Sequence, residues 1–307
     1  MAVLDNTVLA ANIAAAQDIE MLQNFKGDSD RLAEILGIFS PEVVAAGTTM
    51  YQYSVTGALS SASVAEGDEV PLSEYEVEKE PVATITVKPY RKLTTAQAIL
   101  KGGYENAIAK TDRKMLSQVR AGIISDFFTF LGKGTGAATG AGLQAAFAQA
   151  DAELRDTMET NGDAADALVH FVNPFDIADY LAGADVTVQT VFGIQYLQSF
   201  MGVENIFITN KVAKGTMFVT PIENIHIYAV DFAALGTAGL EYAVQDGSLI
   251  GVHHAPAYNR TSAETYVLTG ALMIAEIKDY IVKATITAAG PQEVSVVGTV
   301  ETTSQSS

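Results

Sequence analysis

The chain contains no cysteine, so neither disulfides nor thiol chemistry can contribute to its stability or function. Charged residues make up only 18% of its 307 residues, whereas hydrophobic residues make up 49%. Such a composition predicts a folded protein, much of whose surface is covered by other subunits. Residues 1–6 lack a basic segment followed by an apolar core, so no secretory signal is expected. No apolar run approaches the ~20 residues of a membrane span, and a cytosol-like compartment is expected.

Positive charge is also scarce, because 18 Lys and Arg residues face 36 Asp and Glu residues, for a net charge of −18. This balance argues against a protein whose main task is to bind nucleic-acid phosphates. One group of basic residues is interpreted as the solvated face of a helix, with a local basic patch as the alternative. Its members are Lys101, Lys110, Arg113, Lys114 and Arg120.

An acidic segment at 66–80 is the least generic feature of the chain. It holds seven carboxylates against one lysine, so it cannot form a core of its own. Apolar and polar residues alternate before it, at 50–56, and after it, at 82–91. We therefore predict a β-hairpin whose excursion far exceeds the usual length of about two to five residues, which is typical of a functional loop.

The acidic segment allows three interpretations. Its alternating glutamates suit one face of an extended strand, which favours a solvated hairpin face. An electrostatic contact with the basic patch of a neighbouring subunit is the second interpretation, and a divalent-cation site without EF-hand spacing is the third. The candidate contact residues are Glu66, Asp68, Glu69, Glu74, Glu76, Glu78, Lys79 and Glu80.

A long amphipathic helix is predicted at 104–131. Its apolar stripe consists of Ile108, Met115, Val119, Ile123, Phe127 and Phe130. About 28 residues at ~1.5 Å each span roughly 42 Å, so this helix would be a spine for the fold. A glycine-rich segment at 132–140 ends it. That segment matches neither the phosphate-loop nor the dinucleotide-loop pattern, so we predict a flexible connector.

The second half of the chain predicts a compact mixed α/β unit. A helix at 143–158 is followed by a buried strand at 169–172, and Asn173 and Pro174 then cap and open a helix that ends near Gly183. Later strands are predicted at 248–253, 265–274 and 281–287. The polar segment 291–307 is expected to be disordered.

No residue pattern indicates catalysis, so we predict no enzyme activity, cofactor or metal site. His253 and His254 are adjacent on a predicted strand and would point to opposite faces. His170 and His226 stand alone, with no carboxylate at ligand spacing, and all four are interpreted as core or surface histidines.

The order of these elements resembles the major capsid (head) protein of tailed double-stranded DNA bacteriophages, with its Hong Kong 97-like fold, over about residues 1–290. The resemblance is carried by four segments: the acidic stretch from Glu66 and Gly67, the return at 81–92, Val172-Asn173-Pro174, and Asn259-Arg260-Thr261 followed by 264–268. It implies an α+β fold. The implied domains are an amino-terminal arm (1–45), an extended loop (46–95), a peripheral domain with the spine helix (96–139 and 248–290), an axial α/β domain (140–247) and a flexible tail (291–307).

The resemblance also implies a function. The chain would self-assemble in the host bacterial cytoplasm into pentamers and hexamers of an icosahedral virion capsid, which encloses double-stranded DNA without sequence-specific binding. Expected partners are a separate scaffolding protein, a portal and a decoration protein, and no membrane. Cross-linking through Lys79, Lys88 or Lys92 is not expected. The hinge candidates are Gly102, Gly103, Gly132, Gly134 and Gly136.

Two other functions remain open. An encapsulin-like nanocompartment shell protein would share the fold but enclose enzymes. An acidic cytosolic α/β enzyme would need a convergent polar pocket, which the sequence does not reveal.

Overall fold

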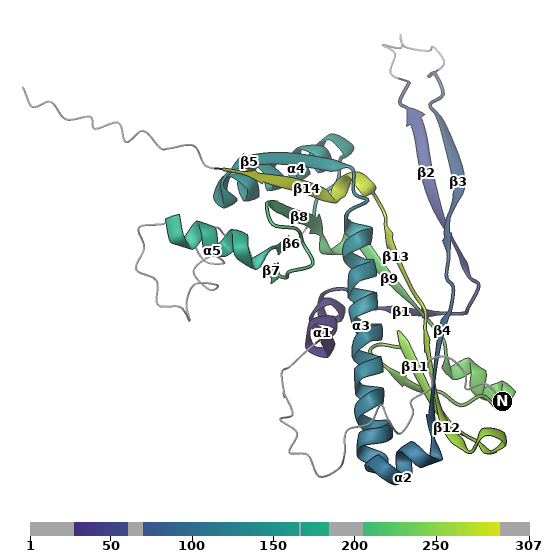
Figure 1. Ribbon diagram of the computed structural model, residues 1–307. Helices are drawn as coiled ribbons and strands as arrows, with labels where there is room; N and C mark the ends of the chain where they lie inside the picture. Colours follow the sequence, from purple (N-terminus) through teal and green to yellow (C-terminus); the bar gives the residue numbers. More distant parts are fainter. Residues whose placement is uncertain (1–27, 61–69, 166, 184–204, 289–307) are drawn as a thin grey trace, which may run out of the picture. The chain divides into compact units, whose positions relative to one another are not determined.

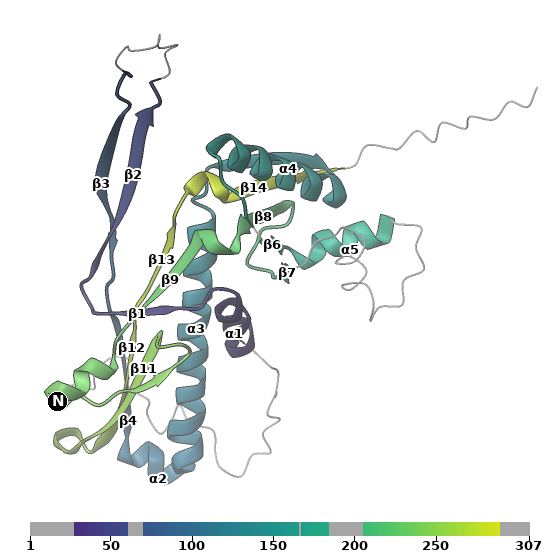
Figure 2. The same ribbon diagram turned by 180° about the vertical axis from the view of Figure 1, so that it is seen from behind.

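The computed structural model of the chain describes residues 28–60, 70–165, 167–183 and 205–288 (Figures 1 and 2). Helices and strands both contribute throughout, as the predicted α+β class requires. The chain divides into two compact units, Met1–Lys133 with Pro221–Lys278, and Gly134–Thr220 with Asp279–Ser307. The predictions for residues 1–27, for Glu66, Asp68 and Glu69, and for the tail at 291–307 lie outside the described residues.

The helix predicted at 104–131 is confirmed, but the spine of the first unit begins earlier, at Ala96. It consists of α2 (Ala96–Tyr104), a π-helical turn η2 (Glu105–Ala109) and α3 (Lys110–Leu131). The side chain of Thr95 accepts a hydrogen bond from the Ala98 amide and so caps α2. The spine ends at Leu131, because Gly132 follows as its cap. Its buried stripe includes Val119, Ile123 and Phe127, and the shorter helix α1 (Asp28–Ile38) packs on it, with the Phe39 ring 5.7 Å from that of Phe127.

Two sheets share the first unit with the spine. An antiparallel sheet has the order β10 (Ala243–Gln245), β11 (Ile250–Ala257), β12 (Ser262–Thr269) and β4 (Lys88–Thr95). A second sheet has the order β1 (Glu42–Val44), β9 (Ile225–Val230) and β13 (Ala271–Ala275). Short 3₁₀ helices lie at η3 (Ile222–Asn224), η4 (Ala233–Ala238), η5 (Tyr258–Arg260) and η6 (Lys278–Tyr280).

The residues predicted as a strand at 265–274 are extended apart from Gly270, but they form two strands rather than one, because the chain changes sheet at Gly270. β12 ends before this residue and β13 begins after it. A side chain here would place its Cβ 2.4 Å from Cγ2 of Val230, so only glycine fits at the crossing.

The acidic hairpin pairs β2 (Thr49–Ala58) with β3 (Glu74–Thr84). The register runs from Thr49 opposite Thr84 to Ala58 opposite Glu74. The predicted return strand at 82–91 was therefore wrong. The return begins at Glu74, within the acidic segment, and residues after Val87 belong to β4, which pairs with β12 instead.

The second unit is built on a five-stranded sheet. Its order is β5 (Gly136–Ala141), β14 (Val282–Thr287), β8 (Thr216–Pro221), β6 (Leu168–Val172) and β7 (Asn205–Ile208). Helix α4 (Leu143–Asn161) packs on β5 and β14, and Leu154, Phe171 and Met217 are fully buried. Helix α5 (Pro174–Gly183) begins as predicted, because Asn173 accepts a hydrogen bond of 2.8 Å from the Phe175 amide.

The prediction of a flexible connector at 132–140 was wrong. The segment runs into β5, which pairs in parallel with β14 from Gly136 opposite Val282. Its glycines serve close packing: a Cβ on Gly140 would lie 2.1 Å from the Ala146 backbone nitrogen at the start of α4.

Candidate functional site

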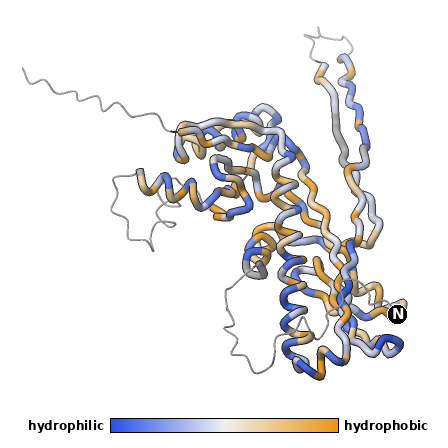
Figure 3. Tube along the Cα trace, viewed as in Figure 1, coloured by the Kyte–Doolittle hydropathy of each residue, from blue (hydrophilic) through white to orange (hydrophobic). Residues whose placement is uncertain are grey.

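The hairpin has two chemically different faces. Hydrophilic residues predominate along the first half of β3 (Figure 3). Because successive side chains of a strand point to opposite faces, Glu74, Glu76 and Glu78 share one face, all exposed. We call this the acidic face. The opposite face carries Tyr75, Val77 and Lys79 from β3 and Tyr51 from β2, and we call it the tyrosine face.

The tyrosine face is ordered by its own contacts. The Lys79 ammonium lies 4.0 Å from the ring centre of Tyr51, a cation–π contact. Gly57 stands opposite Tyr75 in the register, and a Cβ on Gly57 would lie 2.3 Å from Cδ1 of that ring. The Tyr75 ring therefore lies over the glycine backbone. At the far end of the ribbon, the Ser60 amide donates a 3.0 Å hydrogen bond to the Ser73 hydroxyl.

The structure brings only part of the predicted contact set together. Glu74, Glu76 and Glu78 share the acidic face, and Glu80 follows them in β3 opposite Gln52. Lys79, which the sequence grouped with these carboxylates, belongs to the other face. The alternation of the glutamates predicted their shared face correctly. The contact role of these residues stays a prediction.

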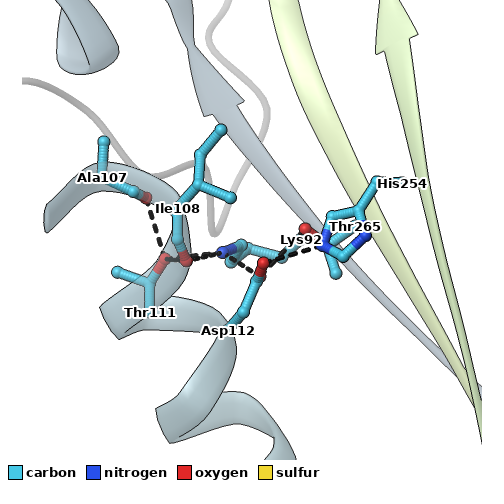
Figure 4. Close-up of polar contacts among 7 residues, drawn as sticks. All are labelled: Lys92, Ala107, Ile108, Thr111, Asp112, His254 and Thr265. Atoms are coloured by element: carbon cyan, nitrogen blue, oxygen red, sulfur yellow. Dashed lines mark hydrogen bonds and ion pairs between the residues drawn. The ribbon is translucent and has the colours of Figure 1, made fainter. Parts of the chain in front are cut away.

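A second polar site, which the sequence analysis missed, joins the spine to the sheet (Figure 4). Asp112 of α3 accepts hydrogen bonds from Lys92 of β4, from His254 of β11 at 2.8 Å and from Thr265 of β12 at 2.9 Å. The Lys92 and Asp112 side chains are only 10% and 12% exposed, so this ion pair is largely removed from water. One carboxylate thus connects three strands to the helix.

The hydrogen bonds at Asp112 decide its charge. Burial alone would raise the pKa of this carboxyl, but the bonds from Lys92, His254 and Thr265 outweigh it and hold the pKa below its ordinary value. Asp112 is therefore ionised at neutral pH, and it forms a complete ion pair with Lys92.

Lys92 also contacts the π-helical turn. Lys92 Nζ lies 2.5 Å from the Thr111 hydroxyl and 3.4 Å from the Ile108 carbonyl oxygen. The Thr111 hydroxyl lies 2.8 Å and 2.9 Å from the carbonyl oxygens of Ala107 and Ile108. The turn keeps backbone hydrogen bonds, such as that from the Lys110 amide to the Glu105 carbonyl, and the two side chains add further hydrogen bonds to its carbonyls.

The basic group at the start of the spine is mostly a solvated helix face, as predicted. Lys101 and Lys114 are exposed, and Arg113 forms an exposed pair with Glu105 at 2.7 Å. Arg120 departs from this interpretation, because it is half-buried and binds Asp246 of the β10–β11 turn at 2.7 Å.

Each of three histidines meets one carboxylate that comes from elsewhere in the chain. His254 binds Asp112, His170 binds Asp151 at 2.7 Å, and His226 binds Glu276 at 2.8 Å. His253 points away from its neighbour, between the rings of Tyr242 and Tyr266. Within the described ranges, no three His, Asp or Glu residues gather as metal ligands.

The hinge candidates occupy different structural positions. Gly103 interrupts the spine with a φ of 73°, Gly102 is buried beside it, and Gly132 caps α3. Gly134 and Gly136 pack against the β14 segment: a Cβ on Gly134 would lie 2.5 Å from Ile281. Their role in bending stays a prediction.

Comparison with solved structures identifies the architecture. A chain of the mature capsid of bacteriophage PhiM1 superposes with a TM-score of 0.55 at 9% identity, covering 89% of this chain and 90% of that one. A capsid chain of Myoviridae phage XM1 gives 0.54 at 10% identity, with 92% and 100% covered. The chain has the Hong Kong 97-like capsid fold.

The Hong Kong 97-like fold is also found in an encapsulin. The SrpI encapsulin of Synechococcus elongatus superposes with a TM-score of 0.54 at 10% identity, covering 90% of this chain and 93% of that one. No family model and no curated protein matches the sequence. Among the described helices, none is long and apolar enough to cross a membrane.

Proposed function

We propose that the chain is the major capsid protein of a tailed double-stranded DNA phage. It self-assembles into pentamers and hexamers of an icosahedral head, which encloses DNA without reading its sequence. The observation that carries the proposal is the extent of the likeness, which covers 89% of this chain and 90% of the PhiM1 capsid chain. The proposal assigns the chain no catalytic role.

Each predicted domain then has a task. The extended loop at 46–95 reaches over a neighbouring subunit, and the arm at 1–45 adds further contacts. The axial domain at 140–247 meets its copies at the centre of each pentamer or hexamer, and the peripheral domain at 96–139 and 248–290 surrounds that centre. The glycines flanking the spine adjust its bend at different positions of the shell.

The net charge supports a container role. At −18, the chain does not bind DNA phosphates tightly as a whole, so a packed genome can leave again. A separate scaffolding protein, a portal and a decoration protein are the proposed partners, and the virion is the proposed location.

A nanocompartment shell is the second candidate. Its specific support is the SrpI encapsulin, whose TM-score of 0.54 equals that of the XM1 capsid chain. In this case the shell would enclose enzymes, and its particles would contain no DNA.

Electron microscopy of the purified chain, with light scattering alongside, tests both candidates. We expect closed shells, rings of five or six subunits, or tubes, and the shell diameter separates a phage head from a small compartment. Nuclease-resistant DNA in particles from infected cells supports the phage head, and co-purifying enzymes support the compartment. A monomer or dimer at every salt concentration and pH, even with a scaffolding protein, would overturn the proposal.

A further inference from the structure

The tyrosine face of the hairpin is an unpartnered sheet face. Tyr51, Tyr75 and Val77 are 49%, 55% and 62% exposed, although they share one face of the paired strands. A two-stranded ribbon alone is at best marginally stable in water, because it has no apolar layer to pack on. Aromatic and aliphatic side chains left open in this way indicate a surface that another molecule covers.

The two faces of the ribbon differ in charge as well as in hydropathy. The described part of the acidic face carries three exposed carboxylates and no cation. Among the hairpin residues whose side chains the structure describes, the tyrosine face carries one cation, Lys79, held over the Tyr51 ring, and no carboxylate. A partner with excess negative charge is therefore repelled by the first face and accepted by the second.

We propose that the hairpin docks through its tyrosine face onto a second copy of this chain, with the acidic face turned away from that copy. This inference rests on the proposed shell function and specifies which side of the hairpin forms the contact. The second copy fits the charge argument, because its net charge of −18 opposes the acidic face and complements Lys79. Repulsion between the carboxylates and the second copy then sets which face of the ribbon turns toward that copy. The apolar side chains of the tyrosine face become buried in the contact and stabilise it.

The absence of cysteine from the chain permits a direct test. Single cysteines are introduced by Val77→Cys on the tyrosine face and by Glu76→Cys, its neighbour on the acidic face. Each variant is mixed as a minority with wild-type subunits, so that one changed contact does not prevent assembly. Maleimide labelling is then followed in dissociated subunits and in assembled shells.

We expect both variants to be labelled in dissociated subunits, because both positions are exposed there, and each rate in shells is compared with the rate of the same variant in dissociated subunits. On assembly, the rate at Val77→Cys should fall at least about tenfold, while that at Glu76→Cys changes less than about twofold, since thiol reactivity follows access to solvent. Protection of both positions, of neither, or of Glu76→Cys alone would overturn the proposed face.

A second measurement tests how much the tyrosine face contributes to the free energy of assembly. The double variant Tyr75→Ser, Val77→Thr should raise the critical concentration for assembly at least about tenfold, because it removes apolar burial from each contact. The matched control Glu76→Gln, Glu78→Gln should leave it unchanged or lower it. An unchanged circular dichroism spectrum of the subunit shows that the fold is intact. If wild-type chains do not assemble even with a scaffolding protein, the shell function itself fails. If they assemble and the tyrosine-face variant assembles equally well, only this inference fails.

Discussion

The carboxylates of the hairpin and of the Asp112 site differ in burial and in hydrogen bonding. Asp112 is buried against the sheet, and three side chains from three strands donate to it. Glu74, Glu76 and Glu78 stand in a row on a ribbon that is exposed on both faces. The first arrangement completes its charge pairing within one subunit. The second leaves both its charge and its apolar side chains open, which is what a surface made for another subunit requires.

The largest expected effect follows from removing the buried carboxylate. Asp112→Ala leaves the Lys92 ammonium buried without its partner, which should lower the free energy of unfolding by about 3–5 kcal/mol. Urea unfolding followed by circular dichroism measures this. The matched control is Asp126→Ala: the Lys88–Asp126 pair is more than half exposed, so its loss should cost less than about 1 kcal/mol. Equal losses would show that burial does not distinguish the two pairs.

Acid should lower the stability of the first unit, because it protonates carboxylates that accept hydrogen bonds from basic side chains. The Asp112 pKa is held below its ordinary value, and the hydrogen bond from Arg91 lowers the pKa of Glu264 likewise. A carboxyl whose pKa is lower in the folded than in the unfolded chain stabilises the fold above the unfolded pKa, and this contribution disappears as the pH falls through the folded pKa. The free energy of unfolding should therefore decrease below about pH 4.

The variant Glu264→Gln isolates part of this pH dependence. It should unfold with a shallower dependence on pH below about pH 4, because the glutamine does not titrate there. Urea titrations at a series of pH values measure the slope. If the free energy of unfolding changed with pH as steeply as in the wild-type chain, Glu264 would not contribute to the pH dependence.

A smaller, local effect is expected at Gly57. The variant Gly57→Ala places a Cβ against the Tyr75 ring and 2.7 Å from the Glu74 carbonyl oxygen, so the ribbon must open there. Amide exchange in β2 and β3 should accelerate about tenfold, while exchange in β11 and β12 stays unchanged. Gly122→Ala is the control: no atom lies within 4 Å of its Cβ position on α3, and the change should stabilise the helix by about 0.5–1 kcal/mol.

The smallest effect is expected on the acidic face. Glu76→Gln with Glu78→Gln removes two exposed charges without removing a contact that the subunit needs. The free energy of unfolding of the subunit should change by less than about 0.5 kcal/mol. A larger loss in urea unfolding would mean that these carboxylates do stabilise the isolated subunit.

Local signals predicted local structure well. The apolar stripe and Gly132 located the spine and its end, and Asn173 with Pro174 located the start of α5. The same signals failed where the chain changes partner. Alternation continues through Val87, and an apolar run continues on both sides of Gly270, so the pattern predicts one strand in each segment. β5 was missed because its residues are Gly, Ala and Thr, chosen for close approach rather than for strand propensity.

The candidate sites show the same limit. The acidic face was visible because its glutamates lie two residues apart in one segment. The Asp112 site draws on residues 92, 112, 254 and 265, which only the folded chain brings together. No spacing in the sequence links these four residues, so no local signal could have found the site.

The π-helical turn at Glu105–Ala109 has a consequence for the length of the chain. Such a turn holds one residue more than an α-helix of the same rise, and here Thr111 and Lys92 replace the hydrogen bonds that it loses. A chain of the same fold without these two side chains could delete one residue here and keep a continuous helix. In an alignment of such chains, a one-residue gap should therefore fall at 105–109 and should accompany the loss of Lys92.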